Sequence, residues 1–365
     1  MRTLRLTLAA SLLLAASACS DMTSPDPAAT GIGDGSAEFG ARRLVLMTQN
    51  LYVGADVDAV LLALVTPDPA DDLPALLGAI QTLQRTDFPT RAAALAAEIE
   101  RRRPHAVGLQ EVSTIEIVLP PLLNFQIDFL PILQQALADR GLDYQVAAQV
   151  KNIDASPVAG VRQVDYDVLL VDADRVTVNA SSGQNFQNNF GPLAPGVTLI
   201  RGWVAANVTI AGKAYTLVST HPEPDLGGNS LAQLRAAQVA EIVTALGTAT
   251  PTVVMGDLND VPGSLMHQVL TNAGFTDVWA ALRPGLVGFT CCHAADLSDR
   301  FPQFDERIDY LFARGFGHGN KAVLGWVNRF GFLPPDRVNG PFGKIWVSDH
   351  AGLVATLLRP SGPKH

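Results

Sequence analysis

The chain has 365 residues, of which 48% are hydrophobic and 17% are charged. This composition predicts a globular protein with a sizeable core, and no repeat or Pro/Gly-rich linker divides the chain after residue 43, so one domain over 43–360 is expected. The formal net charge of −9 argues against nonspecific binding of polyanions, which requires a basic face. It does not exclude a nuclease, because bound metal cations can supply positive charge locally.

Residues 1–18 have the features of a signal peptide. Arg2 and Arg5 precede the apolar run LTLAASLLLAASA, which is too short to span a bilayer as a permanent helix. The small residues before Cys19 resemble the bacterial lipobox and predict lipidation of Cys19, with ordinary cleavage after Ala18 as the alternative. Residues 19–42 read as a flexible tether. We therefore expect an exported monomer in the cell envelope, anchored to the membrane by lipid or else secreted.

Strands and helices alternate irregularly along the rest of the chain. Strands are predicted at 43–50, 105–112, 144–150, 166–172, 252–255, 307–313 and 350–358, and a hairpin is predicted over 202–221 around Ala211-Gly212. Helices are predicted at 90–104 with Thr90 as N-cap, at about 129–140, at 231–247 and at about 263–273. This mixture favours two packed sheets with helices on the outer faces, an α/β sandwich.

Polar residues stand at the ends of these apolar runs. They are Asn50, Glu111, His221, Asp257, Asn259, and the pair Asp349–His350. If the strand ends converge on one rim, a rigid scaffold holds a polar cluster. Carboxylate and amide oxygens are hard ligands that suit Mg²⁺ or Mn²⁺. The stretch GDLN at 256–259 is also compatible with a simple turn, because Gly, Asp and Asn are all turn formers.

Six short motifs occur in an order that resembles the endonuclease/exonuclease/phosphatase superfamily, the deoxyribonuclease I-like metal-dependent phosphoesterases. They are TQN (48–50), LQEV (109–112), STH (219–221), GDLN (256–259), RIDY (307–310) and SDH (348–350). The resemblance spans about residues 43–358. It implies a four-layer α/β sandwich, in which two packed mixed β-sheets are flanked by helices, and a metal-dependent hydrolase of phosphoric esters.

The resemblance also implies roles for individual residues. Asn50 and Glu111 match the metal ligands of the family, Asp349 is expected as a further ligand, and the metal that the resemblance implies is Mg²⁺ or Mn²⁺. Asp257 matches the residue that orients the attacking water and Asn259 the one that contacts the phosphate. His350 matches the terminal histidine that contacts the phosphate and assists proton transfer, Asp309 the acid that orients it, and His221 the second histidine. Arg307 is expected to brace the sheet through an ion pair.

One segment makes this chain longer than the compact members of the family. An insert over about 56–90 is apolar enough to form a helical hairpin near the site and is a candidate substrate lid. Within it, Asp56 and Asp58 could add metal ligands, although a solvated loop is favoured. Cys291 and Cys292 are expected to remain unbridged thiols, because adjacent cysteines rarely bridge each other.

Three functions stay open from the sequence. The first is an envelope-bound phosphodiesterase acting on nucleic acid or another phosphodiester. The second is a phosphoesterase directed at phospholipids or phosphoinositides, similar to sphingomyelinases. The third is a catalytically inactive binding lipoprotein; inactive relatives should lose metal-binding or water-orienting residues, whereas this chain keeps the whole set.

Overall fold

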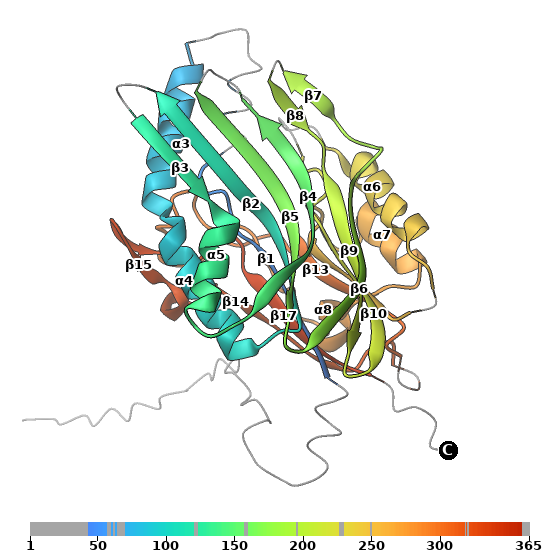
Figure 1. The fold of residues 1–365 in the computed structure, drawn as a ribbon. Helices are drawn as coiled ribbons and strands as arrows, with labels where there is room; N and C mark the ends of the chain where they lie inside the picture. Colours follow the sequence, from blue (N-terminus) through green and yellow to red (C-terminus); the bar gives the residue numbers. More distant parts are fainter. Residues whose placement is uncertain are drawn as a thin grey trace, which may run out of the picture. The chain divides into compact units, whose positions relative to one another are not determined.

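The larger of two sheets contains the first strand of the domain (Figure 1). The computed structural model describes residues 43–359 except 57–59, 61–62, 64–69, 120–122, 157–159, 195, 226–229, 249, 318 and 320. Nine of the described strands form this sheet, with β3 pairing with β2. In spatial order they are β14 (Gly325–Phe330), β17 (Gly352–Leu358), β1 (Arg43–Asn50), β2 (Ala106–Leu119), β5 (Val161–Asp172), β4 (Tyr144–Ala155), β8 (Val197–Leu199) and β7 (Gly191–Ala194), then β3 (Leu123–Asp128) beside β2.

The smaller sheet contains six of the described strands. In spatial order they are β12 (Thr276–Asp277), β13 (Asp309–Arg314), β11 (Thr252–Asp257), β10 (Lys213–Thr220), β9 (Gly202–Ile210) and β6 (Val176–Asn185). A separate two-stranded hairpin consists of β15 (Val338–Gly340) and β16 (Gly343–Ile345). Both large sheets are mixed, because β1 runs parallel to β2 but antiparallel to β17, and β10 runs parallel to β11 but antiparallel to β9.

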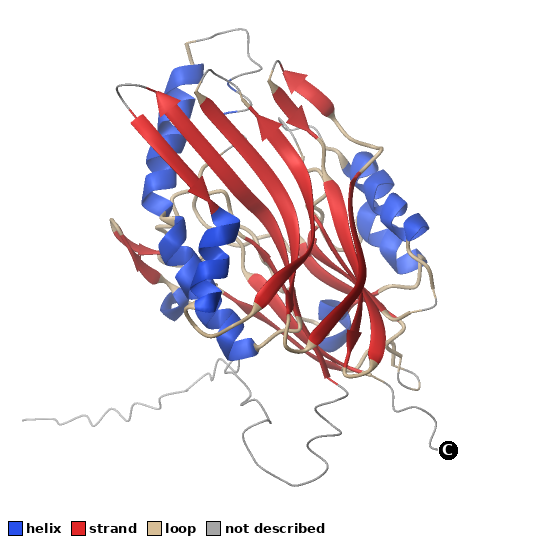
Figure 2. Ribbon diagram, viewed as in Figure 1, coloured by secondary structure: helices blue, strands red, loops and turns tan. Residues whose placement is uncertain are grey.

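Helices cover the outer face of each sheet (Figure 2). The larger sheet carries α4 (Phe88–Arg102) and α5 (Phe129–Ala138), and the smaller sheet carries α6 (Ala232–Ala245) and α7 (Leu265–Asn272). The remaining described helices are α3 (Asp72–Thr86), α8 (Val278–Leu282) and the 3₁₀ turn η2 (Pro334–Asp336). The result is the predicted four-layer α/β sandwich. None of the helices that the structure describes is long and apolar enough to cross a membrane.

The apolar strands are hydrophobic on both faces because each face packs against a different layer. In β1, Leu44 and Leu46 lie in the core between the two sheets, whereas Val45 and Met47 pack against α4 and α5. Successive side chains of a strand point to opposite faces, so a strand buried on both sides has no polar alternation. The continuous apolar run LVLM therefore follows from the central position of β1.

Most of the predicted elements are present, with shifted boundaries. The hairpin over 202–221 is confirmed as β9 and β10, with Ala211 and Gly212 both at positive φ in its turn. The N-cap prediction for 90–104 is wrong: α4 begins at Phe88 after the N-cap Asp87, and the Thr90 hydroxyl donates to Asp87 Oδ2 at 2.5 Å. The strand predicted to end at residue 112 continues to Leu119.

The predictions for the N-terminal segment lie outside the described residues. This holds for the signal peptide, the tether and Cys19, and also for Asp58 in the insert. Of the predicted helical hairpin over about 56–90, the structure describes α3, which is followed directly by α4. The role of this segment as a lid stays a prediction.

Candidate functional site

The strand register explains why polar residues from distant parts of the chain meet. Asn50 ends β1, Asp257 ends β11, and His221 follows β10 directly. Because β10 and β11 are parallel, their carboxyl ends lie at the same edge of the smaller sheet. Strand β13 is antiparallel to β11, so the beginning of β13 lies at this same edge. Its first residue, Asp309, is paired with Asp257. In the larger sheet, β17 begins just after His350 and runs antiparallel to β1.

The amide of Asn50 joins two carboxylates of the site. Its Nδ2 donates to Glu111 Oε1 at 2.9 Å and to Asp257 Oδ2 at 3.1 Å, while its Oδ1 accepts from the Tyr52 amide at 2.8 Å. The loop after Asn50 is held by the buried guanidinium of Arg91 in α4, which donates to the carbonyls of Leu51 and Tyr52. A helix of the outer layer thus fixes the position of Asn50.

A β-bulge places Glu111 in the site. The β2–β5 ladder pairs Leu109 with Val168 and Val112 with Tyr166, so two residues of β2 oppose one residue of β5. Glu111 adopts a positive φ of 55° there, and its Oε2 accepts from the Val53 amide at 2.9 Å. A bulge of this kind redirects one side chain without ending the strand. The sequence indicated that Glu111 stands near the end of a short strand. It lies instead within the long strand β2.

Two histidines flank the buried carboxylate of Asp257. His221 Nε2 lies 3.4 Å and His350 Nε2 3.7 Å from Asp257 Oδ2. Burial alone would raise the pKa of Asp257. The positive charge of His350 and His221 outweighs burial, so the pKa lies below its ordinary range. Asp257 is therefore held as a carboxylate. Its other oxygen, Oδ1, accepts from the Asn259 amide at 3.0 Å.

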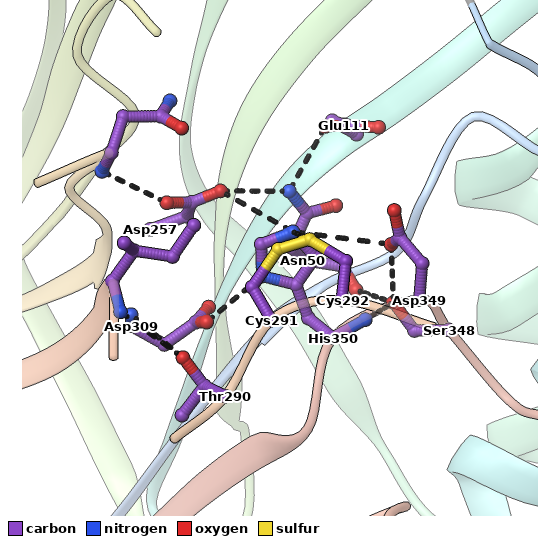
Figure 3. The surroundings of a disulfide bond; sticks show 12 residues. Asn50, Glu111, Asp257, Thr290, Cys291, Cys292, Asp309, Ser348, Asp349 and His350 are labelled. Atoms are coloured by element: carbon purple, nitrogen blue, oxygen red, sulfur yellow. Dashed lines mark hydrogen bonds and ion pairs between the residues drawn. A yellow bond between two sulfur atoms is a disulfide. The ribbon is translucent and has the colours of Figure 1, made fainter. Parts of the chain in front are cut away.

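His350 and Asp309 form a buried pair (Figure 3). His350 Nδ1 lies 2.8 Å from Asp309 Oδ2, which leaves Nε2 directed toward Asp257. Burial lowers the pKa of His350, but three nearby carboxylates outweigh burial and raise this pKa well above its ordinary value. These carboxylates belong to Asp309, Asp349 and Asp257. The surrounding carboxylates therefore favour the protonated form of the His350 ring.

His221 is oriented by a residue that the sequence did not suggest. Arg201 Nη1 lies 3.1 Å from His221 Nδ1, and Arg201 Nε lies 3.3 Å from Glu223 Oε2. A guanidinium only donates, so in the neutral ring Nδ1 accepts this bond and the proton resides on Nε2, which faces Asp257. Burial and Arg201 lower the pKa of His221, while Asp257 raises it to a net value above normal.

The side chain of Asn259 is tied to the segment that carries His221. Its Nδ2 donates to the Pro222 carbonyl at 3.0 Å, and its backbone has a positive φ of 51°. The turn after β11 is thus locked at both its side chain and its backbone amide. The prediction that Asn259 contacts a phosphoryl group stays a prediction.

Acidic groups around Glu111 are crowded. Burial and the charge of Glu111 raise the pKa of Asp165 to about 7, and burial also raises that of Asp167 to about 6. Both residues lie on β5, where Asp165 Oδ1 accepts from the Ser113 hydroxyl at 3.0 Å. For Asp349, burial followed by Glu111 and Asp257 raises the pKa to about 7, although His350 lowers it. Buried carboxylates in mutual repulsion define a region that favours a cation.

The residues predicted to hold a metal fit a hard divalent cation. Glu111 and Asp349 supply two carboxylates that repel each other, as the raised pKa of Asp349 shows, and Mg²⁺ is commonly bound through one or two carboxylates. Asn50 Oδ1 accepts one hydrogen bond, which leaves its second lone pair for a cation, whereas Nδ2, the atom that faces Glu111 here, is only a donor. A further group of possible ligand atoms lies next to this one, in Asp257, Asp309 and His350.

Cys291 and Cys292 form a disulfide beside His350, so the expectation of unbridged thiols is wrong (Figure 3). The pair lies on a segment that precedes β13, and Cys292 Sγ lies 3.9 Å from His350 Nε2. Two backbone bonds fix the segment on either side of the pair: the Ala351 amide donates to the Thr290 carbonyl and the His293 amide to the Asp349 carbonyl, each at 2.8 Å. These bonds bring the sulfurs to the site.

Arg307 has the structural role that was expected of it. Its guanidinium donates to the two carboxylate oxygens of Asp277 at 2.6 Å and 3.2 Å. Arg201, Asp165, Asp167 and the cysteine pair were missed as parts of the site. The buried acids in the run DYDVLLV were a usable signal, because carboxylates rarely stand in an apolar central strand without a function.

Comparisons with known proteins agree with this geometry. The family model described as "Endonuclease/Exonuclease/phosphatase family" matches residues 47–350. A solved endonuclease/exonuclease/phosphatase from Beutenbergia cavernae is 21% identical with a TM-score of 0.57, covering 89% of this chain and 73% of that one. A family protein from Leptotrichia buccalis is 13% identical with a TM-score of 0.54, covering 86% and 99%.

A solved Bacteroides thetaiotaomicron protein titled mannosyl-6-phosphatase is 14% identical with a TM-score of 0.53 and covers 86% of this chain and 99% of its own. At these identities the solved structures show a shared fold. No curated protein matches the chain. With six ordered motifs converging on one edge of a four-layer sandwich, and a family model that matches from β1 to His350, the chain belongs to the endonuclease/exonuclease/phosphatase family.

Proposed function

We propose that this chain is a metal-dependent phosphoesterase that hydrolyses phosphodiester bonds. The observation that carries the proposal is the position of the Asp257 carboxylate between the Nε2 atoms of His221 and His350. Hydrolysis of a phosphoric ester needs an oriented water, positive charge near the phosphoryl oxygens and a proton for the leaving oxygen. Residues suited to each of these tasks lie within this one cluster.

The proton positions define a division of roles. Asp257 is anionic, so it orients the attacking water toward phosphorus and accepts the proton that the water loses as the oxygen–phosphorus bond forms. His350 is cationic, and its Nε2 donates a proton to the leaving oxygen. The other ring proton stays on Nδ1, which donates a hydrogen bond to Asp309. His221 donates from Nε2 to the phosphoryl group, and the turn at Asn259 adds an amide contact to the same group.

A divalent cation supplies charge neutralisation on the phosphoryl oxygens when it is bound. Asn50, Glu111 and Asp349 would hold it, and Mg²⁺ or Mn²⁺ suits their oxygen atoms. The crowding of Glu111, Asp165 and Asp349 supports this assignment, because a cation would relieve their repulsion.

The direct test uses bis-p-nitrophenyl phosphate, an activated phosphodiester. Purified residues 20–365 should hydrolyse it in Mg²⁺ or Mn²⁺ and stop when a chelator is added. Asp257→Asn removes the water-orienting charge with little change of volume, and we expect a loss of about a hundredfold or more. Asp174→Asn, at an exposed position on the loop after β5, is the control and should retain activity. Hydrolysis that persists without metal, or in Asp257→Asn, would refute the mechanism.

Assays on several substrates side by side would distinguish the substrate classes that the sequence left open. Plasmid DNA, RNA, phospholipid vesicles and a sugar phosphomonoester should be assayed under the same conditions. The net charge of −9 leads us to expect weak and salt-sensitive binding of long nucleic acid. Inactivity on every phosphoester with metal bound would instead support a binding protein.

We also propose that the mature chain is anchored to the cell envelope through a lipid on Cys19. The proposal is supported by the small residues before Cys19 and the apolar run that precedes them. Cys19→Ala should move the protein from the membrane fraction to the soluble fraction, because no acyl chain can then be attached. Equal membrane association of the two forms would show that Cys19 is not the anchor.

A further inference from the structure

The donor atoms of Cys291, Cys292 and His350 form a compact group next to the proposed catalytic atoms. One ligand atom from each residue lies within 4.8 Å of the other two. Cys292 is exposed and Cys291 is buried, so a reductant in solution can reach the bond through Cys292. The Cys291 amide donates to the Glu306 carbonyl at 3.2 Å, and the Asp305 amide donates to the Cys291 carbonyl at 3.1 Å. We call these three residues the cysteine–histidine group.

We propose that the cysteine–histidine group is an inhibitory site for a soft divalent cation such as Zn²⁺, formed when the Cys291–Cys292 disulfide is reduced. A dithiol reductant supplies two electrons and two protons, becomes a disulfide itself and leaves two thiols on the protein. Binding of Zn²⁺ then releases both thiol protons and the Nε2 proton of His350, because thiolates and a deprotonated ring nitrogen are the ligands. His350 contributes Nε2 as the third ligand.

The surroundings of His350 suit this role. Asp309 occupies Nδ1 at 2.8 Å, so Nε2 is the nitrogen that a metal can reach. A carboxylate behind a metal-binding histidine fixes the tautomer and increases the basicity of the ligand. Tetrahedral zinc, with Zn–S of about 2.3 Å and Zn–N of about 2.1 Å, separates sulfur and nitrogen ligands by about 3.6 Å. The observed distance from Cys292 Sγ to His350 Nε2 is 3.9 Å (Figure 3).

Charge and position both predict inhibition. Asp257 Oδ2 and Asp349 Oδ1 lie 3.7 Å and 3.9 Å from His350 Nε2, and their negative charge favours a cation there. A zinc ion on Nε2 occupies the atom that we assign to protonating the leaving oxygen. Loss of activity therefore rests on the proposed function, whereas zinc binding does not.

The experiment compares the full chain in its oxidised form and after reduction with a phosphine, which avoids a thiol that binds zinc. Zn²⁺ alone is titrated into each form by calorimetry, and Co²⁺ in place of Zn²⁺ reports thiolate ligation through its near-ultraviolet charge-transfer absorption. We expect the reduced protein to bind one more equivalent of Zn²⁺ than the oxidised protein. We also expect Zn²⁺ to lower its Mg²⁺-dependent hydrolysis by at least about tenfold, reversibly with a chelator.

The double variant Cys291→Ser/Cys292→Ser is the control, and Cys19 is then its only remaining cysteine. It should bind no additional zinc and show no thiolate absorption under reducing conditions. Equal zinc stoichiometry in the oxidised and reduced wild-type protein would overturn the proposal, whatever the activity. An extra equivalent that persists in the double variant would also overturn it, because the cysteines would not be the ligands. If hydrolysis is absent in all forms, the proposed function fails while the zinc titration still decides the site.

Discussion

Asp309 Oδ2 lies 2.8 Å from His350 Nδ1, and the two side chains are 0% and 6% exposed. The contact joins the first residue of β13 in one sheet to a residue two positions before β17 in the other. A carboxylate in this position holds the imidazole in one orientation and stabilises its positive charge. Because Asp309 acts through the ring, it is a positioning residue.

This relationship predicts strong non-additivity. His350→Ala and Asp309→Ala should each lower the rate, and the double variant should be hardly slower than His350→Ala, because Asp309 has no ring to orient once His350 is gone. Asp309→Asn, which keeps an acceptor for Nδ1, should retain more activity than Asp309→Ala. Steady-state rates on bis-p-nitrophenyl phosphate measure the cycle. Additive losses in log rate would mean that Asp309 acts independently of His350.

Arg201 is predicted to fix the tautomer of His221. At high pH, where the ring is neutral, ¹⁵N NMR of histidine-labelled protein should show the proton on Nε2, since Arg201 donates to Nδ1. Arg201→Met should allow the other tautomer and lower kcat by about tenfold or more, with a smaller change in KM. Arg162→Met, at an exposed arginine paired with Asp154, is the control. A wild-type ring that carries its proton on Nδ1 would contradict the assignment.

The sequence identified the strands that carry the site because each is a dense apolar run that stops at a polar residue. In β11, Val253 and Met255 face one layer and Val254 faces another, so the run had no polar interruption before Asp257. The edge strands were harder to predict. β6 was missed because most of its side chains are exposed and few are apolar. Its pairing with β9 is what makes it a strand.

The sequence could not predict contacts that depend on irregular backbone or on pairing across the sheets. Glu111 reaches the site through a bulge, which is a property of the β2–β5 register and not of the motif LQEV. The β9–β10 hairpin was predicted, but Arg201 and His221 lie just outside its two strands, and no motif marks the contact between their side chains. The cysteine pair was judged by the rarity of bridges between neighbours, and that general expectation was wrong here.

Glu111 and Asp349 are predicted to bind the metal. Glu111→Gln should weaken Mg²⁺ or Mn²⁺ binding by about tenfold or more, because it removes one of two carboxylates. In the wild-type protein, affinity should fall as pH drops below about 7, since a proton on Asp349 then competes with the metal. Calorimetric titration at several pH values measures both effects. Glu116→Gln, at an exposed residue of the same strand, should bind metal like the wild type.

Asp165 links the acidity of the site to the stability of the fold. Its pKa is raised from 3.8 to about 7, first by burial and then by Glu111. The folded chain therefore holds a proton on Asp165 more tightly than the unfolded chain does. This contribution to stability is fully present below about pH 4 and is lost as pH rises through about 7. Asparagine cannot ionise, so Asp165→Asn should become more stable relative to the wild type between about pH 5 and about pH 8.

The comparison uses denaturant unfolding in a chelator, so that no bound metal changes the charge on Asp165. Asp154→Asn is the control on the neighbouring strand, because hydrogen bonds from Arg162 and Lys151 lower the pKa of Asp154. A lowered carboxyl pKa affects stability only below about pH 4, so this variant should follow the wild type across the same range. If Asp165→Asn and the wild type lose stability equally with rising pH, Asp165 is already ionised in the folded protein, and the cation-attracting cluster around Glu111 carries more negative charge than its burial indicates.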